Sequence, residues 1–396
     1  MELSVLLALR DPAGIPFYPV VFQGLYILTW ALHIAFVLLA LGSAGLSLFG
    51  STQRNNVHWK QLTPHLIQTG KLSVSLLIVL GVAPLLFTQV IYDPNWYVAN
   101  TLSGMWVFIF IYALIVGYCM YYWYYYANKA KHGGGVIVGA ISFGFLVFCG
   151  VLMHSFTVTS LMPNDWMEMY MPNGVVDMGG WTFNVETIRL AFMVSLAIPV
   201  VGIFLQAYSR FVSTRKDFEA SYVAFTASLG TKAAIIGLVL SAALFVLWMF
   251  TIGYLFHPIS LATVVGVVIL LGLSAQNRNS YITVGWLVVV ALLISGVREW
   301  IRYDIMAALG YTIYDYPVNL ELPSLIMFLS TFLVMGGVGV AYLLMMAWKV
   351  GKSEGVFDGS KDVAVTKLGN YTLAIMSAWI VIFFGWGLTI LFNNIL

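Results

Sequence analysis

The sequence VGWLVVVALLISGVREWIR, residues 284–302, indicates what kind of protein this chain is. The run 284–296 carries no charge and leads directly into Arg298, Glu299 and Arg302. Charged side chains are costly in lipid, so they are normally paired, bound to a ligand or buried in a protein cavity. Glu299 and Arg302 stand three residues apart, so on a helix they share a face and their side chains can contact the same bound group. The simpler interpretation is an ion pair that reaches toward water at the end of a membrane span.

The composition excludes a water-soluble protein. Hydrophobic residues make up 61% of the chain and charged residues 9%, whereas soluble domains carry about 25% charged residues. Apolar runs recur from end to end, and only helices or closed barrels can satisfy their backbone in lipid. The net charge is +2, and no basic patch indicates a nucleic-acid partner. The chain is therefore predicted to be embedded in a lipid bilayer.

We predict an all-α fold, a polytopic transmembrane helical bundle of about ten spans that forms a single integral membrane domain, residues 1–396. The limits of the spans are set by the length of each apolar run and by the residues that interrupt it. The spans are predicted near 20–49, 65–91, 102–126, 135–162, 184–208, 221–254, 259–275, 281–300, 322–348 and 368–393.

The distribution of basic residues predicts the orientation. With the N-terminus outside, the inner connections hold twelve Lys and Arg residues, and the outer side holds Arg10, Arg298 and Arg302. This asymmetry follows the positive-inside rule. The unusual polar residues then gather in the outer half of the membrane.

Two histidines lie at membrane depth among apolar neighbours, His33 in the first span and His154 in the fourth. A buried imidazole needs a partner, and an axial bond to haem iron is one solution. A hydrogen bond to a neighbouring helix is the alternative. Arg189 opens the fifth span on the same side. Cys119 and Cys149 form no Cys-x-x-Cys-His motif for covalent haem attachment.

The ordered set of motifs resembles subunit I of the cytochrome bd family of quinol oxidases. The resemblance is good over about residues 25–190, weak over 205–280, and returns at 295–303. It is carried by Leu32-His33, Phe36-Val37, Leu39-Ala40-Leu41-Gly42, Leu62-Thr63, Lys71-Leu72, Gly81-Val82-Ala83, Asn95-Trp96, Trp166-Met167, Phe183-Asn184-Val185-Glu186-Thr187-Ile188-Arg189 and Glu299-Trp300-Ile301-Arg302.

The resemblance implies a set of cofactor ligands. His33 would be the axial ligand of one high-spin haem, the d-type haem in that family, and Glu299 would ligate a b-type haem. Arg302, together with Arg298, would stabilise propionate or ligand charge. His154 has no counterpart in the family, and is a candidate replacement ligand or proton relay. The implied location is the prokaryotic inner (cytoplasmic) membrane, with the N-terminus and the haem site on the outer side.

Three departures from the family pattern limit the resemblance. The family's low-spin haem uses a His on the fifth helix and a Met on the sixth, and the fifth span here contains no histidine. The large quinol-binding loop is missing between spans six and seven. The third span, 102–126, lacks the glutamates that deliver protons in the family.

The leading hypothesis is therefore a haem-binding membrane subunit of a respiratory complex. It would take electrons from a periplasmic cytochrome c or quinol and pass them toward oxygen or a partner redox centre. The alternative is a non-catalytic electron-conducting or anchoring subunit of a larger oxidoreductase, with an outer loop (Asp165, Glu168, Asp177) that could dock a basic cytochrome c. A secondary transporter is disfavoured, since no internal repeat is visible. Both favoured hypotheses require other membrane subunits as partners.

Overall fold

A computed structural model describes residues 3–53, 55–130, 135–176 and 180–395. Its helices confirm the predicted all-α transmembrane bundle, and no strand is present in these ranges apart from an isolated bridge between Ile15 and Val318. The helices are α1 (Leu3–Ala8), α2 (Pro19–Thr52), α3 (Val57–Ile91), α4 (Asp93–Leu102), α5 (Gly104–Lys129), α6 (Gly135–Ser160), α7 (Trp166–Tyr170), α8 (Thr187–Ser195), α9 (Ala197–Val212), α10 (Ala220–Thr251), α11 (Pro258–Gln276), α12 (Ser280–Ala307), α13 (Leu322–Leu329), α14 (Gly337–Lys352) and α15 (Val363–Ile395).

Within the described residues, ten segments are long and apolar enough to cross a membrane, as predicted. The second begins at Val57, earlier than the predicted residue 65. The reason is a cap, because the Asn56 side chain accepts hydrogen bonds from the amides of His58 and Trp59 at 2.9 and 3.2 Å. The fifth span consists of α8 and α9, and the ninth joins α13 to α14 through a π-helical turn, Ser330–Gly336. The single-domain organisation stays a prediction.

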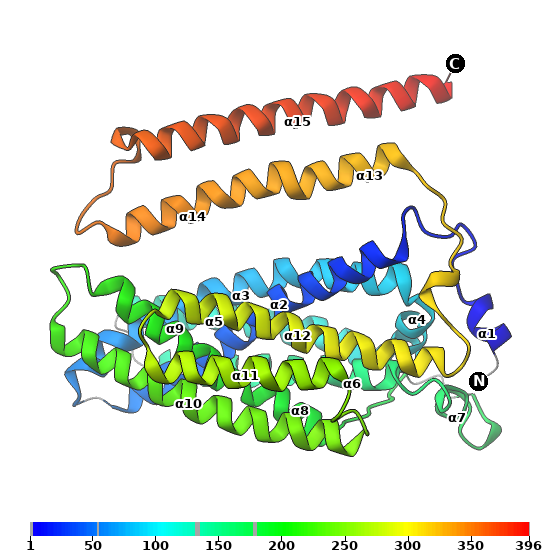
Figure 1. The fold of residues 1–396 in the computed structure, drawn as a ribbon, viewed down its shortest axis with the longest axis horizontal. Coiled ribbons are helices and arrows are strands. Elements are labelled where there is room, and N and C mark those ends of the chain that lie inside the picture. Colours follow the sequence, from blue (N-terminus) through cyan, green and yellow to red (C-terminus); the bar gives the residue numbers. More distant parts are fainter. Residues whose placement is uncertain (1–2, 54, 131–134, 177–179, 396) are drawn as a thin grey trace.

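Helix α2 is central to the bundle. It packs against α3, α6, α9 and α12, and Figure 1 shows it running between α3 and α12. Close approach of the helices depends on small residues, since a Cβ added at Gly202 of α9 would lie 2.4 Å from the backbone nitrogen of Ala234 on α10. Helices α1, α4 and α7 gather at one end of the bundle, which we call the α4 end (Figure 1).

The last two spans stand apart from the other eight. Helix α15 packs on α14 and on the π-helical turn that joins α13 to α14, and Figure 1 shows these helices as a separate layer alongside the bundle. No residue in the apolar windows of these two spans is buried, against 56% for the span formed by α8 and α9. Contacts join the layer to the bundle near its ends, where Phe328 meets Phe87 with ring centroids 6.4 Å apart and Arg215 donates to the Gly351 carbonyl at 2.7 Å. Broad apolar surfaces are therefore left for lipid or other subunits.

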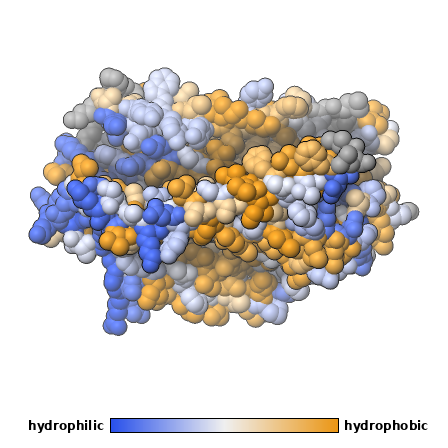
Figure 2. Space-filling view, turned by 90° about the horizontal axis from the view of Figure 1, so that it is seen from above, coloured by the Kyte–Doolittle hydropathy of each residue, from blue (hydrophilic) through white to orange (hydrophobic). Residues whose placement is uncertain are grey.

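The surface has the polarity expected of a membrane protein. Figure 2 shows hydrophobic side chains over the middle of the visible face and hydrophilic ones concentrated toward one end. Together with the ten apolar helices, this pattern identifies an integral membrane protein.

Candidate functional site between α2 and α12

One face of α2 carries the polar and aromatic side chains of the site. Gln23, Tyr26, Trp30 and His33 are spaced three, four and three residues apart, so they follow one stripe of the helix. The last turns of α12 lie against α2 and contribute Arg298, Glu299 and Arg302, each at most 8% exposed. The packing of these two helices assembles the site.

Glu299 is held by donors from two other segments. Its Oε1 accepts hydrogen bonds from Gln23 Nε2 at 2.9 Å and from the Tyr92 hydroxyl at 2.7 Å. Its Oε2 faces Arg302 Nη1 at 3.5 Å, a long contact. Burial, followed by the neighbouring carboxylate, raises the pKa of Tyr92, so its hydroxyl keeps its proton and can donate. Oε2 is the less occupied of the two oxygens.

The arginines of the site carry unused donors. Arg298 Nη1 and Arg302 Nε are buried and have no hydrogen-bond partner among the described residues. The Arg298 guanidinium lies 3.7 Å from the centroid of Trp30, and that of Arg302 lies 4.9 Å from Tyr26. Aromatic faces offset part of the cost of burying a cation, but buried donors without acceptors remain unfavourable. The arrangement suits an anion with oxygen acceptors.

His33 is oriented by the backbone of α3. Its Nδ1 lies 2.8 Å from the Leu77 carbonyl oxygen. A carbonyl can only accept, so Nδ1 carries the proton and Nε2 keeps its lone pair. Gly81 makes room for the ring, because a Cβ there would lie 2.9 Å from His33 Cε1. A backbone bond that fixes the tautomer in this way is typical of metal-ligating histidines.

His154 and Arg189 connect α6 to the start of α8. His154 Nε2 accepts a hydrogen bond from the Glu186 amide at 3.1 Å, which occupies the lone pair that a metal would need in this tautomer. Arg189 is 4% exposed and pairs with Glu186 at 3.6 Å. Arg298 lies within electrostatic range of His33, His154 and Arg189. The site thus combines three buried guanidinium groups with one buried carboxylate, Glu299, and the partly exposed Glu186.

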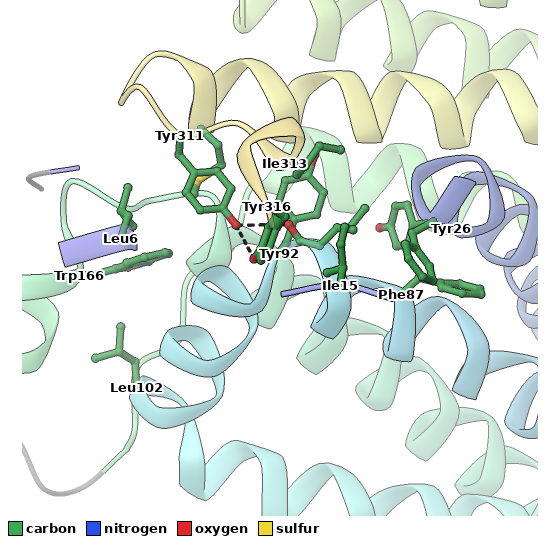
Figure 3. Packing of buried hydrophobic residues seen from close by; sticks show 13 residues of the cluster. Leu6, Ile15, Tyr26, Phe87, Tyr92, Leu102, Trp166, Tyr311, Ile313 and Tyr316 are labelled. Carbon is green, nitrogen blue, oxygen red and sulfur yellow. Dashed lines mark hydrogen bonds between the residues drawn. The ribbon is translucent and has the colours of Figure 1, made fainter. Parts of the chain in front are cut away.

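A second polar cluster closes the α4 end beside Tyr92. The Tyr316 hydroxyl donates to Asp93 Oδ1, and the Asp11 amide donates to Oδ2 at 2.8 Å. Tyr311 and Tyr316 share a 2.8 Å hydrogen bond (Figure 3), and the Arg10 guanidinium lies 4.1 and 4.4 Å from their ring centroids. Burial raises the pKa of Asp93 and raises that of Tyr311 to about 12. This cluster fixes the N-terminal segment against the end of α3.

The structure brings Arg298, Glu299 and Arg302 together and places Arg189 and both histidines around them. Sequence analysis missed Gln23, Tyr26, Trp30 and Tyr92. The three on α2 could have been found, because they share the helical stripe of His33. Tyr92 offers no such signal, since it reaches Glu299 from the turn between α3 and α4.

Other predicted groups lie away from this site or outside the description. Asp165 is the N-cap residue of α7 and Glu168 lies in its first turn, and both are exposed; Asp177 lies outside the described residues. In the described part of the chain, no three His, Cys, Asp or Glu side chains are grouped so that they could hold a metal ion.

Comparison with known proteins adds one relationship. No family model matches the sequence, and no curated protein matches it at a significant level. Among solved structures, the chain is similar to the bd oxidase from Geobacillus thermodenitrificans, with a TM-score of 0.57 and 13% identity over 84% of this chain and 98% of that one. At this identity the likeness concerns the fold alone, and it supports a bd-oxidase-like fold, the coarser part of the resemblance predicted from the motifs. The chain is an integral membrane protein with a bd-oxidase-like fold.

Proposed function

We propose that this chain is a haem-binding subunit of a respiratory electron-transfer complex in the prokaryotic inner membrane, with its N-terminus and site on the outer side. The observation that carries the proposal is the set of buried, unused donors on Arg298 and Arg302 beside Glu299. Buried charge of this kind in a membrane span is normally functional. The bd-oxidase-like fold supports it.

The residues present fit a haem. His33 Nε2 keeps a lone pair for iron, and Glu299 Oε2 is the less engaged carboxylate oxygen. Arg298 Nη1 and Arg302 Nε need acceptors that propionates would provide. His154 contributes less to this proposal, because its Nε2 is already bonded. When bound, haem supplies one-electron redox chemistry, while the protein supplies ligands, charge and a dry surrounding.

The chain's own residues would then have distinct tasks. Glu299 would hold a b-type haem, and His33 would hold the other haem, which is d-type in the bd family. Three arginines, Arg298, Arg302 and the nearby Arg189, would neutralise the charge of the haem propionates. Their positive charge would also raise the affinity of the haem for an electron. Tyr92 would keep the Glu299 carboxylate in one orientation through its 2.7 Å bond. Electrons would enter from a periplasmic cytochrome c or quinol and leave toward oxygen or a partner redox centre.

A second function is an electron-conducting or anchoring subunit that is not itself catalytic. It is favoured by two observations. The third span contains no Asp or Glu to deliver protons, and the layer formed by α13, α14 and α15 exposes its apolar faces to further subunits. In either function the chain would act together with other membrane subunits.

The deciding experiment is a reduced-minus-oxidised absorbance spectrum of the purified protein, with haem extraction and added carbon monoxide. A band that responds to carbon monoxide supports an open iron position and the oxidase function. Haem without that response favours the conducting subunit. A protein that contains no haem contradicts the haem-binding function and leaves the anchoring subunit as the function.

Two substitutions assign the ligands. Glu299→Ala and His33→Ala are each expected to remove the absorbance of a different haem while the protein remains inserted. Glu168→Ala and His58→Ala are matched controls at residues away from the site. An unchanged spectrum in either site variant contradicts that ligand, and identical losses in both indicate collapse of the whole site.

A further inference from the structure

A long cavity lies inside the bundle, bordered by Trp30 of the charged site but by none of that site's charged residues. It measures about 490 Å³ and is bounded by α2 and α8 to α12. On α12 the lining residues run from Tyr281 to Ile294, which is roughly 20 Å by helical rise. The cavity is therefore elongated along the membrane normal.

The lining of the cavity is apolar. Its Ser and Thr hydroxyls are already used, because Ser241 Oγ pairs with Ser195 Oγ at 2.8 Å and Thr263 Oγ1 donates to the Ile259 carbonyl at 2.8 Å. The other lining residues with a polar atom in the side chain are Trp30 and Tyr281. None of the described lining residues is a His, Met, Cys, Asp or Glu. The cavity offers no side chain of these types to ligate iron and no charge to bind a polar molecule.

The cavity opens toward lipid between α2 and α12. Leu32 on α2 and Val288 on α12 both line it, yet they are 39% and 42% exposed. Residues that face the cavity and the surface at once mark its mouth. Since both helices are membrane spans, the mouth faces the hydrocarbon region of the bilayer.

Protein interiors are close-packed and hold few voids larger than a water molecule, so an apolar cavity of this size is exceptional. Large apolar cavities stay dry and take up apolar molecules, and this one has the size of a ligand pocket. We infer that it binds a single long hydrocarbon chain, the acyl chain of a phospholipid or the isoprenoid tail of a quinone. This inference goes beyond the proposed function and does not require haem.

The test uses the full-length protein in vesicles of phosphatidylethanolamine and phosphatidylglycerol. One preparation contains a phospholipid with a photoactivatable diazirine in its acyl chain, and the other contains a prenylquinone with a diazirine in its tail. After irradiation, mass spectrometry maps the labelled peptides. Label on inward-facing lining residues such as Leu238 and Val290 is expected. The preparation that gives it identifies the source of the chain.

Two neighbouring alanines on α10 provide a matched pair. Ala242 lines the cavity, whereas Ala243 is exposed. Ala242→Trp fills the space and should remove the label from the lining residues, while Ala243→Trp should leave it unchanged. Ala291→Phe on α12 repeats the test from the opposite wall if Ala242→Trp fails to insert. Labelling confined to exposed positions, or inner labelling that survives both filling variants, overturns the inference.

Discussion

The hydroxyl of Tyr92 donates a 2.7 Å hydrogen bond to Glu299 Oε1, joining the turn after α3 to the last turns of α12 across 207 residues of chain. Gln23 of α2 donates to the same oxygen at 2.9 Å. Three segments thus meet at one carboxylate oxygen and leave the other facing Arg302. The orientation of Glu299 is consequently set by tertiary packing.

Replacing Tyr92 with Phe should free the carboxylate to rotate. Loss of a buried hydrogen bond to a charged group costs about 1–3 kcal/mol. We expect Tyr92→Phe to shift the midpoint potential and absorbance of the haem assigned to Glu299, measured by spectroelectrochemical titration. Tyr97→Phe is the control, because Tyr97 is 58% exposed on α4. Equal potentials in the two variants would show that Tyr92 has no positioning role.

Gly81 is expected to determine the position of His33. A methyl group at residue 81 would approach His33 Cε1 to 2.9 Å, which is closer than packed atoms tolerate. Gly81→Ala should therefore displace the imidazole and lower the content of the haem assigned to His33, measured by the haem-to-protein ratio. Gly24→Ala on α2 is the control, since nothing lies within 4 Å of its added Cβ. Full haem content in Gly81→Ala would contradict this role.

Arg298 should have opposite effects on the protein with and without haem. Its Nη1 has no partner among the described residues, and a buried donor left without an acceptor is destabilising. In haem-free protein, Arg298→Met should leave the melting temperature unchanged or raise it. In haem-loaded protein, Arg298→Met should lower both the retention of haem and the midpoint potential of the haem. Lys129→Met, at an exposed residue, controls for loss of a positive charge. A lower melting temperature without haem would indicate a structural role.

The cluster at the α4 end predicts a pH dependence. Burial raises the pKa of Asp93, against the hydrogen bonds from Tyr316 and the Asp11 amide, so the folded state holds this proton more tightly than the unfolded state does. The resulting stabilisation is fully present below about pH 4, the ordinary pKa of Asp, and is lost as the pH rises through the folded-state pKa. Thermal unfolding at several pH values measures the slope of stability against pH.

Asp93→Asn should flatten that slope, because amides do not titrate. Asp165→Asn, at an exposed residue without a capping hydrogen bond, is the control and should keep the wild-type slope. If Asp93→Asn and the wild type respond to pH identically, Asp93 does not titrate in this range.

The sequence by itself determined the fold class and the number of spans. Apolar length decides both, because a backbone in lipid must satisfy its own hydrogen bonds, and residues such as 284–296 leave no alternative to a helix. The sequence also singled out His33 and the group Arg298, Glu299 and Arg302, since charges and imidazoles are rare at membrane depth.

Tertiary structure alone decided how these residues are engaged. Helical spacing places Glu299 and Arg302 on one face, but it cannot show that Gln23 and Tyr92 hold one carboxylate oxygen. Nor could it show that the Glu186 amide occupies His154 Nε2 while His33 keeps its lone pair. These differences depend on contacts between helices far apart in the chain, and periodicity along one helix carries no information about its neighbours.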